Sequence, residues 1–101
     1  MYQLNYHSKS IPGLTSKNLE NILNEATSTN GERNITGCLI YHNESFVQIL
    51  EGEKKDVLEV YNKIKEDKRH HSIMKLYEND VDRRSFIDWN MAYHKPDDQF
   101  I

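Results

Sequence analysis

The sequence predicts an α+β domain of the ferredoxin-like type, a β-α-β-β-α-β sandwich in which two helices cover one face of a mixed β-sheet. Two apolar runs, Asn34–Tyr41 and Phe46–Leu50, are joined by a short polar cluster, which is typical of a β-hairpin. Segments with apolar residues at helical spacing lie on either side of this hairpin. Strand-like segments lie at both ends of the chain, so an extra final strand is expected after the six-element sandwich. This fold hosts many unrelated functions and therefore does not decide between them.

Composition and charge limit the classes of function. The chain has 101 residues, enough for one domain, with 29% charged residues and a net charge of −3. This balance argues against a nucleic-acid-binding protein that works by neutralising phosphates. No run of about 20 apolar residues could span a membrane, and no basic and apolar leader opens the chain. Cys38 is the one cysteine, so a cytoplasmic protein without a disulfide or a multi-cysteine metal site is expected.

The first part of the chain predicts a strand followed by a helix. Tyr2–His7 alternates apolar and polar residues, which is the pattern of a half-buried strand. Ser8–Gly13 ends in a Pro-Gly pair and is predicted to be a loop. Thr15 suits the N-cap of a helix, and the pair Asn30-Gly31 is expected to end that helix. The apolar stripe of the helix consists of Leu19, Ile22, Leu23 and Ala26.

The part after the hairpin predicts a second helix and two further strands. Glu53–Glu66 has apolar residues at helical spacing, His71–Asp80 contains an apolar strand-like run, and Phe86–Tyr93 is the predicted final strand. Residues 1–95 are expected to form the domain, with 96–101 as a polar C-terminal tail. The apolar stripe of the second helix consists of Val57, Val60, Tyr61 and Ile64.

Gln48 is a polar residue within an apolar strand. It shares the phase of Phe46 and Leu50, so its amide points toward the predicted core. An unpaired buried amide would cost roughly 1–3 kcal/mol, so Gln48 is either a core glutamine with internal partners or a residue that contacts a ligand. Tyr6 has the apolar phase of the first strand. Its hydroxyl could bond to the Gln48 amide if the two strands are neighbours.

A charged cluster follows the second predicted helix. Asp67, Arg69 and His70 are typical of a solvated helix end, although Arg69 and His70 could also hold a phosphate. His70 and His71 are adjacent in a strand entry and point to opposite sides, so no metal site is expected. The sequence contains no spacing typical of a serine hydrolase, a zinc protease or a P-loop.

Five stretches of the chain together resemble a known family. They are L-N-Y-H-S, N-I-T-G-C-L-I-Y, F-V-Q-I-L-E-G-E, V-Y-N-K-I-K-E-D-K-R-H and F-I-D-W-N-M. Their order and spacing over Tyr2–Tyr93 resemble the BLUF family, bacterial blue-light sensors that use FAD. No single stretch is decisive, whereas the combination is specific.

The resemblance implies a flavin ring held between the two helices without a covalent bond. FAD is the expected cofactor, and FMN and riboflavin are alternatives. The photoactive residues are implied to be Tyr6 and Gln48, with Trp89 and Met91 as a semi-mobile pair near the glutamine. The implied cofactor-binding residues are Tyr6, Ile22, Thr29, Asn30, Gln48, Lys63, Ile64, Asp67, Arg69 and His70.

The function implied is that of a light sensor and not an enzyme. Tyr6 would donate an electron and then a proton, and Gln48 would change its hydrogen bonds by rotation or tautomerisation. The signal would pass through the sheet to an unidentified protein effector, or to a second copy through the open sheet face. The alternative function is a ferredoxin-like small-molecule or protein-interaction module without a chromophore.

The chain departs from the family pattern at three points. Thr29 stands where members often carry Asn or His, so a weaker flavin contact is expected there. Lys63 stands where some members have Arg or His. Many members continue into C-terminal helices that cover the open sheet face, so in this chain that face is expected to be exposed, to dimerise or to meet a separate partner.

Overall fold

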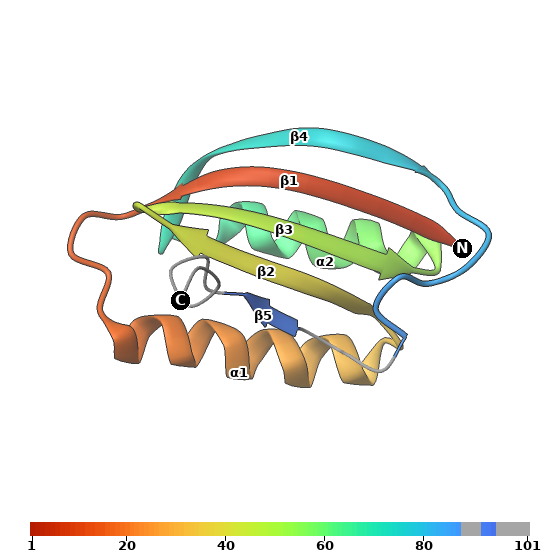
Figure 1. Cartoon of the computed structure of the whole chain (residues 1–101), viewed down its shortest axis with the longest axis horizontal. Coiled ribbons are helices and arrows are strands. Elements are labelled where there is room, and N and C mark those ends of the chain that lie inside the picture. Colours follow the sequence, from red (N-terminus) through yellow and green to blue (C-terminus); the bar gives the residue numbers. More distant parts are fainter. Residues whose placement is uncertain (88–91, 95–101) are drawn as a thin grey trace, which may run out of the picture.

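Seven elements follow one another in the predicted order, in a computed structural model that describes residues 1–87 and the backbone of 92–94. They are β1 (Tyr2–Ser10), α1 (Ser16–Glu32), β2 (Thr36–His42), β3 (Ser45–Gly52), α2 (Lys54–Glu66), β4 (His70–Asp80) and β5 (Ala92–His94) (Figure 1). Within the described part of the chain, no helix is long and apolar enough to cross a membrane.

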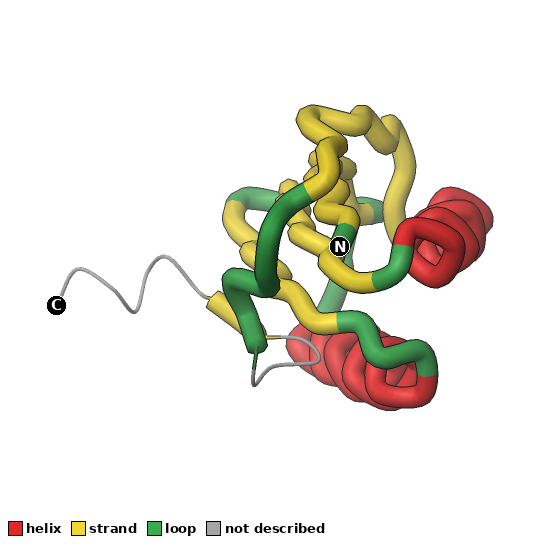
Figure 2. Tube along the Cα trace, turned by 90° about the vertical axis from the view of Figure 1, so that its right-hand side faces the viewer, coloured by secondary structure: helices red, strands yellow, loops and turns green. Residues whose placement is uncertain are grey.

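The strands form one five-stranded sheet in the order β4-β1-β3-β2-β5. β1 pairs antiparallel with β3 and β4, and β2 pairs antiparallel with β3. β5 runs parallel to β2, which makes the sheet mixed. Both helices lie on the same side of the sheet (Figure 2). The predicted ferredoxin-like fold class is therefore confirmed, with β5 as the extra strand.

The two ends of α1 differ in how well local sequence predicts them. Thr15 is the N-cap as predicted: its side chain accepts a hydrogen bond from the Asn18 amide, and the Asn18 side chain accepts one from the Thr15 amide, both at 3.1 Å. The prediction that Asn30-Gly31 ends the helix is wrong, because the helix continues to Glu32. The left-handed residue that redirects the chain is Asn34, with φ 56°.

Two predicted segment boundaries are also wrong. β1 continues through Ser8 and Ser10, which are buried, instead of entering a loop at Ser8. The predicted final strand does not begin at Phe86, because Phe86 lies in a bend and Ile87 in a turn, and the described strand is β5. Trp89 and Met91 lie outside the described residues, as does the predicted tail at 96–101.

A tight turn joins β2 to β3 at Asn43 and Glu44. Both residues have positive φ, 48° and 61°, which is the conformation of a type I′ turn. This turn matches the natural twist of paired strands. Close packing of the hairpin also explains the glycine of the I-T-G stretch: a Cβ on Gly37 would lie 1.9 Å from the carbonyl oxygen of Ile49. The position therefore excludes any larger residue.

The core lies between the sheet and the helices. Alternate residues of β1 and β3 point to this side, so the predicted strand phases, including those of Tyr6 and Gln48, are confirmed. The α1 stripe packs against the core while partly exposed. The buried apolar residues are Tyr2, Leu4, Tyr6, Ile35, Leu39, Phe46, Leu50, Val57, Val60 and Tyr61.

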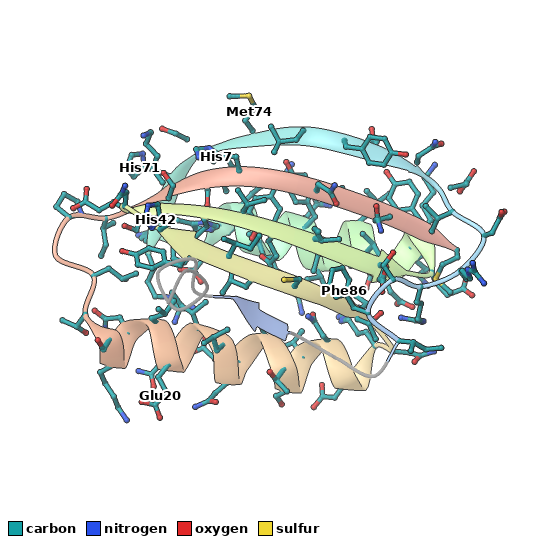
Figure 3. The ribbon with its side chains drawn as sticks, in the orientation of Figure 1. His7, Glu20, His42, His71, Met74 and Phe86 are labelled. Atoms are coloured by element: carbon teal, nitrogen blue, oxygen red, sulfur yellow. The ribbon has the colours of Figure 1, made fainter. Side chains whose placement is uncertain are left out.

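A buried carboxylate anchors the chain that follows β4. Glu51 is fully buried on the sheet face away from the helices, because it alternates with Leu50 along β3. It accepts hydrogen bonds from the backbone amides of Ser85 at 2.9 Å and Phe86 at 2.6 Å, and from the Thr36 hydroxyl at 2.8 Å. Figure 3 shows Phe86 at this end of the sheet. The carboxylate thus fixes the segment that leads toward β5.

Arg84 reinforces this anchor from the same segment. Its guanidinium donates to the Thr36 hydroxyl at 2.9 Å and to the backbone carbonyls of Glu51 at 3.1 Å and Asn34 at 2.7 Å. The side chain of Arg84 and the backbone amides of the next two residues therefore together bind to β2, β3 and the turn before β2.

Glu51→Ala is expected to lower the free energy of unfolding by about 1–3 kcal/mol, because it removes the acceptor of two backbone amides and a buried hydroxyl. Urea unfolding measures the change. The matched control is Glu53→Ala, which removes the same charge from an exposed N-cap residue that makes no side-chain cap bond. The control should stay within about 0.5 kcal/mol of the parent. Equal effects of the two substitutions would contradict the anchoring role.

Candidate functional site

A cavity of about 180 Å³ lies between the two helices and the helix-facing side of the sheet. A single water needs about 10–15 Å³ of such space, so the cavity can accept a planar ring system. It is lined by all ten residues proposed from the sequence to contact a cofactor. They are Tyr6, Ile22, Thr29, Asn30, Gln48, Lys63, Ile64, Asp67, Arg69 and His70.

Five further lining residues were missed by sequence reasoning. Periodicity contained the signal for each. Glu25 and Ala26 follow Ile22 by one helical turn, and Val60 precedes Ile64 by one turn. Phe46 has the strand phase of Gln48, and Leu39 pairs with Gln48 across the hairpin. The missed residues are Glu25, Ala26, Leu39, Phe46 and Val60.

Tyr6 and Gln48 face each other across the two central strands. They are register partners in the β1–β3 ladder, and the two residues are 2% and 5% exposed. The Tyr6 hydroxyl donates a hydrogen bond to Oε1 of Gln48. The expected tyrosine–amide bond is therefore present. Gln48 has an internal partner and also lines the cavity, so the two interpretations of this residue are compatible.

Burial keeps the Tyr6 phenol protonated. Loss of solvation raises the pKa of Tyr6 well above its ordinary value of 10.0, and the nearby Tyr61 and Asp67 raise it further. The ring centroid of Tyr6 lies 5.6 Å from that of Tyr61 and 6.4 Å from that of His70. Tyr6 is therefore a neutral phenol packed among aromatic rings.

His70 lines the cavity and is positioned by two hydrogen bonds. Its Nε2 lies 2.6 Å from the carbonyl oxygen of Ile64, so Nε2 carries a proton. Its Nδ1 lies 2.8 Å from the hydroxyl of Ser8, which is fully buried. Ser8, for which the sequence predicts a loop, lies in β1 and is thereby in reach of His70.

The last turn of α1 supplies a second amide to the cavity. Asn30 is 1% exposed, and its backbone carbonyl accepts hydrogen bonds from the amides of Ile35 at 2.8 Å and Arg33 at 3.2 Å. These bonds tie the end of α1 to the start of β2. Asn30 therefore lies inside α1, which continues past Gly31, and it lines the cavity.

Asp67 and Arg69 form an ion pair at the edge of the cavity. The guanidinium binds the carboxylate with two parallel bonds, Nε to Oδ1 at 3.0 Å and Nη2 to Oδ2 at 2.5 Å. The Arg69 side chain holds the pKa of Asp67 below its ordinary 3.8, and Asp67 raises the pKa of Arg69. Nη2 also lies 2.6 Å from a carboxylate oxygen of Glu25. A role of Arg69 in phosphate binding stays a prediction.

The lining residues fit a flavin ring. Ile22 and Ile64 provide apolar side chains from opposite helices, while Asn30 and Gln48 are buried amides. An amide carries both donors and acceptors, which match the carbonyl and N–H groups along the pyrimidine edge of a flavin. The described residues contain no group of three or more His, Cys, Asp or Glu side chains that could hold a metal ion.

Comparison with known proteins identifies the family. A family model described as sensors of blue light using FAD matches residues 1–92. The chain belongs to the BLUF family. The family model confirms the resemblance described above. A flavin cofactor and a blue-light sensor function, which the resemblance implied, are the properties of this family.

Individual relatives agree with this assignment. The beta subunit of a photoactivated adenylate cyclase from Euglena longa is 33% identical over 90 residues, 88% of this chain and 10% of the relative. A bacterial light-regulated adenylyl cyclase has a TM-score of 0.92 at 35% identity, over 95% of this chain and 28% of the other. The ground state of BlsA gives a TM-score of 0.92 at 33% identity, over 97% and 66%. The chain spans only about a tenth of the length of its curated cyclase relatives.

Asp67→Asn is expected to lower the free energy of unfolding by about 0.5–1 kcal/mol at neutral pH. Because Arg69 lowers the pKa of Asp67 in the folded chain, the stabilisation is complete above the ordinary value of 3.8. It is lost as the pH falls from there toward the lower pKa of the folded chain. Urea unfolding of both proteins at several pH values should show a constant difference above 3.8 that shrinks on acidification. A difference that persists unchanged at the lowest pH would contradict the charge-based explanation.

Proposed function

We propose that the cavity binds the flavin ring between Ile22 and Ile64, and that Tyr6 and Gln48 are its photoactive pair. The observation that carries this proposal is the hydrogen bond from the Tyr6 hydroxyl to the Gln48 amide, made by two buried side chains that line the same cavity. Asn30 is the second amide for the ring edge, with Thr29 beside it. The other polar contacts are assigned to Lys63, Asp67, Arg69 and His70.

The Tyr6–Gln48 pair can couple electron loss to proton transfer. A bound flavin supplies absorption of blue light and, once excited, a strong one-electron oxidant. Tyr6 is a neutral phenol, and a phenol that loses an electron becomes a strong acid. Its proton already points at Oε1 of Gln48, so the proton leaves along an existing hydrogen bond. Return of the electron and the proton restores Tyr6, so no atom is gained or lost.

After this cycle, the lasting change is in the hydrogen bonds of the Gln48 side chain. In the structure its carbonyl oxygen accepts from Tyr6, which directs the amide nitrogen elsewhere. After rotation or tautomerisation, the donor and acceptor positions of the side chain are exchanged. The same residues then surround the ring with a different hydrogen-bond pattern, which explains a small red shift without a chemical change in the cofactor.

We assign the output to a protein partner and not to catalysis within this domain. We place the domain at residues 1–95 and the protein in the cytoplasm. Support comes from β3, which carries Gln48 toward the cavity and Glu51 toward the opposite face, where Glu51 holds Ser85 and Phe86. Relatives described as photoactivated cyclases contain a similar domain as a small part of a longer chain. An effector or a second copy could meet the open sheet face, where Met74 and Tyr77 are 59% and 46% exposed.

Tyr6→Phe is expected to bind flavin with nearly the parent affinity and to lose the light-induced red shift. Ring burial is unchanged by the loss of one hydroxyl, whereas the electron and proton donor is removed. Absorption spectra of the purified protein before and after blue light test this. The matched control is Tyr41→Phe on β2, whose hydroxyl lies 3.5 Å from Ser10 and which does not line the cavity. It should keep the red shift, and a red shift in Tyr6→Phe would remove Tyr6 from the mechanism.

The same preparation separates the sensor from a module without a chromophore. A parent protein that is yellow, with a structured flavin band, supports the proposed function. A colourless parent that does not bind added FAD would support the alternative of a small-molecule or protein-interaction module.

Met91→Ala is expected to keep flavin binding and the red shift but to reduce the light-dependent change in the segment after β4. We propose that Trp89 and Met91 respond to Gln48, because both follow within five residues of Phe86, whose backbone amide is held by Glu51. Hydrogen exchange over Phe86–Tyr93, compared between dark and lit protein, measures the change. A lit-state response equal to that of the parent would show that Met91 does not carry the signal.

A further inference from the structure

The formal charges of the side chains that line the cavity sum to zero, with His70 counted as neutral. Among the lining residues, Lys63 and Arg69 are basic while Glu25 and Asp67 are acidic. Flavins differ in charge, since riboflavin has no phosphate, FMN carries a phosphate of nearly two negative charges, and FAD carries a pyrophosphate. A site that selects phosphate needs cations whose donors are available to it. The cavity edge instead pairs its arginine with two carboxylates.

The two carboxylates hold Arg69 in different ways. Asp67 lies two residues before Arg69 and binds it through two parallel bonds, so it orients the guanidinium. Glu25 comes from α1 and reaches the same Nη2 at 2.6 Å. Its side chain is 62% exposed, against 30% for Arg69. The contact of Glu25 with Arg69 therefore joins α1 to the segment after α2 from the solvent side of the cavity edge.

We propose that Glu25 is a specificity-determining residue that competes with flavin phosphate for Arg69. A phosphate that binds the Nη2 donor of Arg69 must displace the carboxylate of Glu25 from it. The site then holds a flavin by its ring and discriminates weakly between FAD, FMN and riboflavin. This inference rests on the proposed binding of flavin in the cavity.

The test is the affinity of apoprotein for FAD, FMN and riboflavin, measured by calorimetry for the parent and for Glu25→Gln. Glutamine keeps the size of the side chain and removes its charge. FAD and FMN should bind about two- to fivefold more tightly to the variant, which is the size expected for one exposed ion pair. Riboflavin should change little. The gain for FAD and FMN should shrink at high salt, because exposed charges are screened.

Glu20→Gln is the matched control. Glu20 lies on the same helix five residues earlier, is exposed, and points away from the rest of the molecule in Figure 3. It removes the same charge without touching Arg69. The three affinities should stay at the parent values, and a gain equal to that of Glu25→Gln would overturn the inference in favour of a general charge effect.

A double substitution tests whether Glu25 acts through Arg69. In an Arg69→Ala background, Glu25→Gln should leave the ratio of FAD to riboflavin affinity unchanged, because the residue competed for is gone. A gain that persists there overturns the inference, as does an unchanged ratio in the single variant. Either result leaves flavin binding by the parent intact. A parent that binds none of the three flavins would overturn both the proposed function and this inference.

Discussion

The pairing of β1 with β3 places Tyr6 opposite Gln48, and the rest of the site depends on this register. A slip of one residue would turn every side chain of a strand to the other face of the sheet. The ladder runs without interruption from Tyr2–Gly52 to Lys9–Ser45. The type I′ turn before β3 and the Glu51 anchor near its end hold β3 from both directions. The helices then need only to supply the cavity walls.

Buried polar groups determine how the elements dock, because apolar contacts alone permit many similar packings. Ser8 on β1 bonds to His70 at the start of β4, and Glu51 on β3 bonds to Ser85 after β4. Each bond joins elements that are distant in sequence. Misdocking would leave a buried polar group unpaired at a cost of roughly 1–3 kcal/mol, so these groups favour one arrangement over its neighbours.

What the sequence predicts well is local. Strand phase, helix stripes and the Thr15 cap follow from residues within a few positions of one another, and all were confirmed. The wrong boundaries at Ser8 and Phe86 occur where a distant partner decides the outcome, whereas α1 runs past Gly31 and the chain is redirected locally at Asn34. Ser8 has the polar character of a loop residue, yet its partner is 62 positions away. The ten cavity residues came from family resemblance combined with phase, whereas the contact of Glu25 with Arg69 has no local signature.

The size of the event at Gln48 limits which parts of the domain can respond to it. Exchange of one hydrogen bond is worth about 1 kcal/mol, so it can shift only an equilibrium between states of similar free energy. The central strands are held on both sides by ladders and cannot supply such an equilibrium. Among the described residues after β4, Ser85 and Phe86 are held by Glu51, Arg84 bonds to the Glu51 carbonyl, and Ile87 is 72% exposed. Since Glu51 lies three residues from Gln48 on the same strand, a change at the photoactive pair can reach this segment through the hydrogen bonds that Glu51 accepts from Ser85 and Phe86.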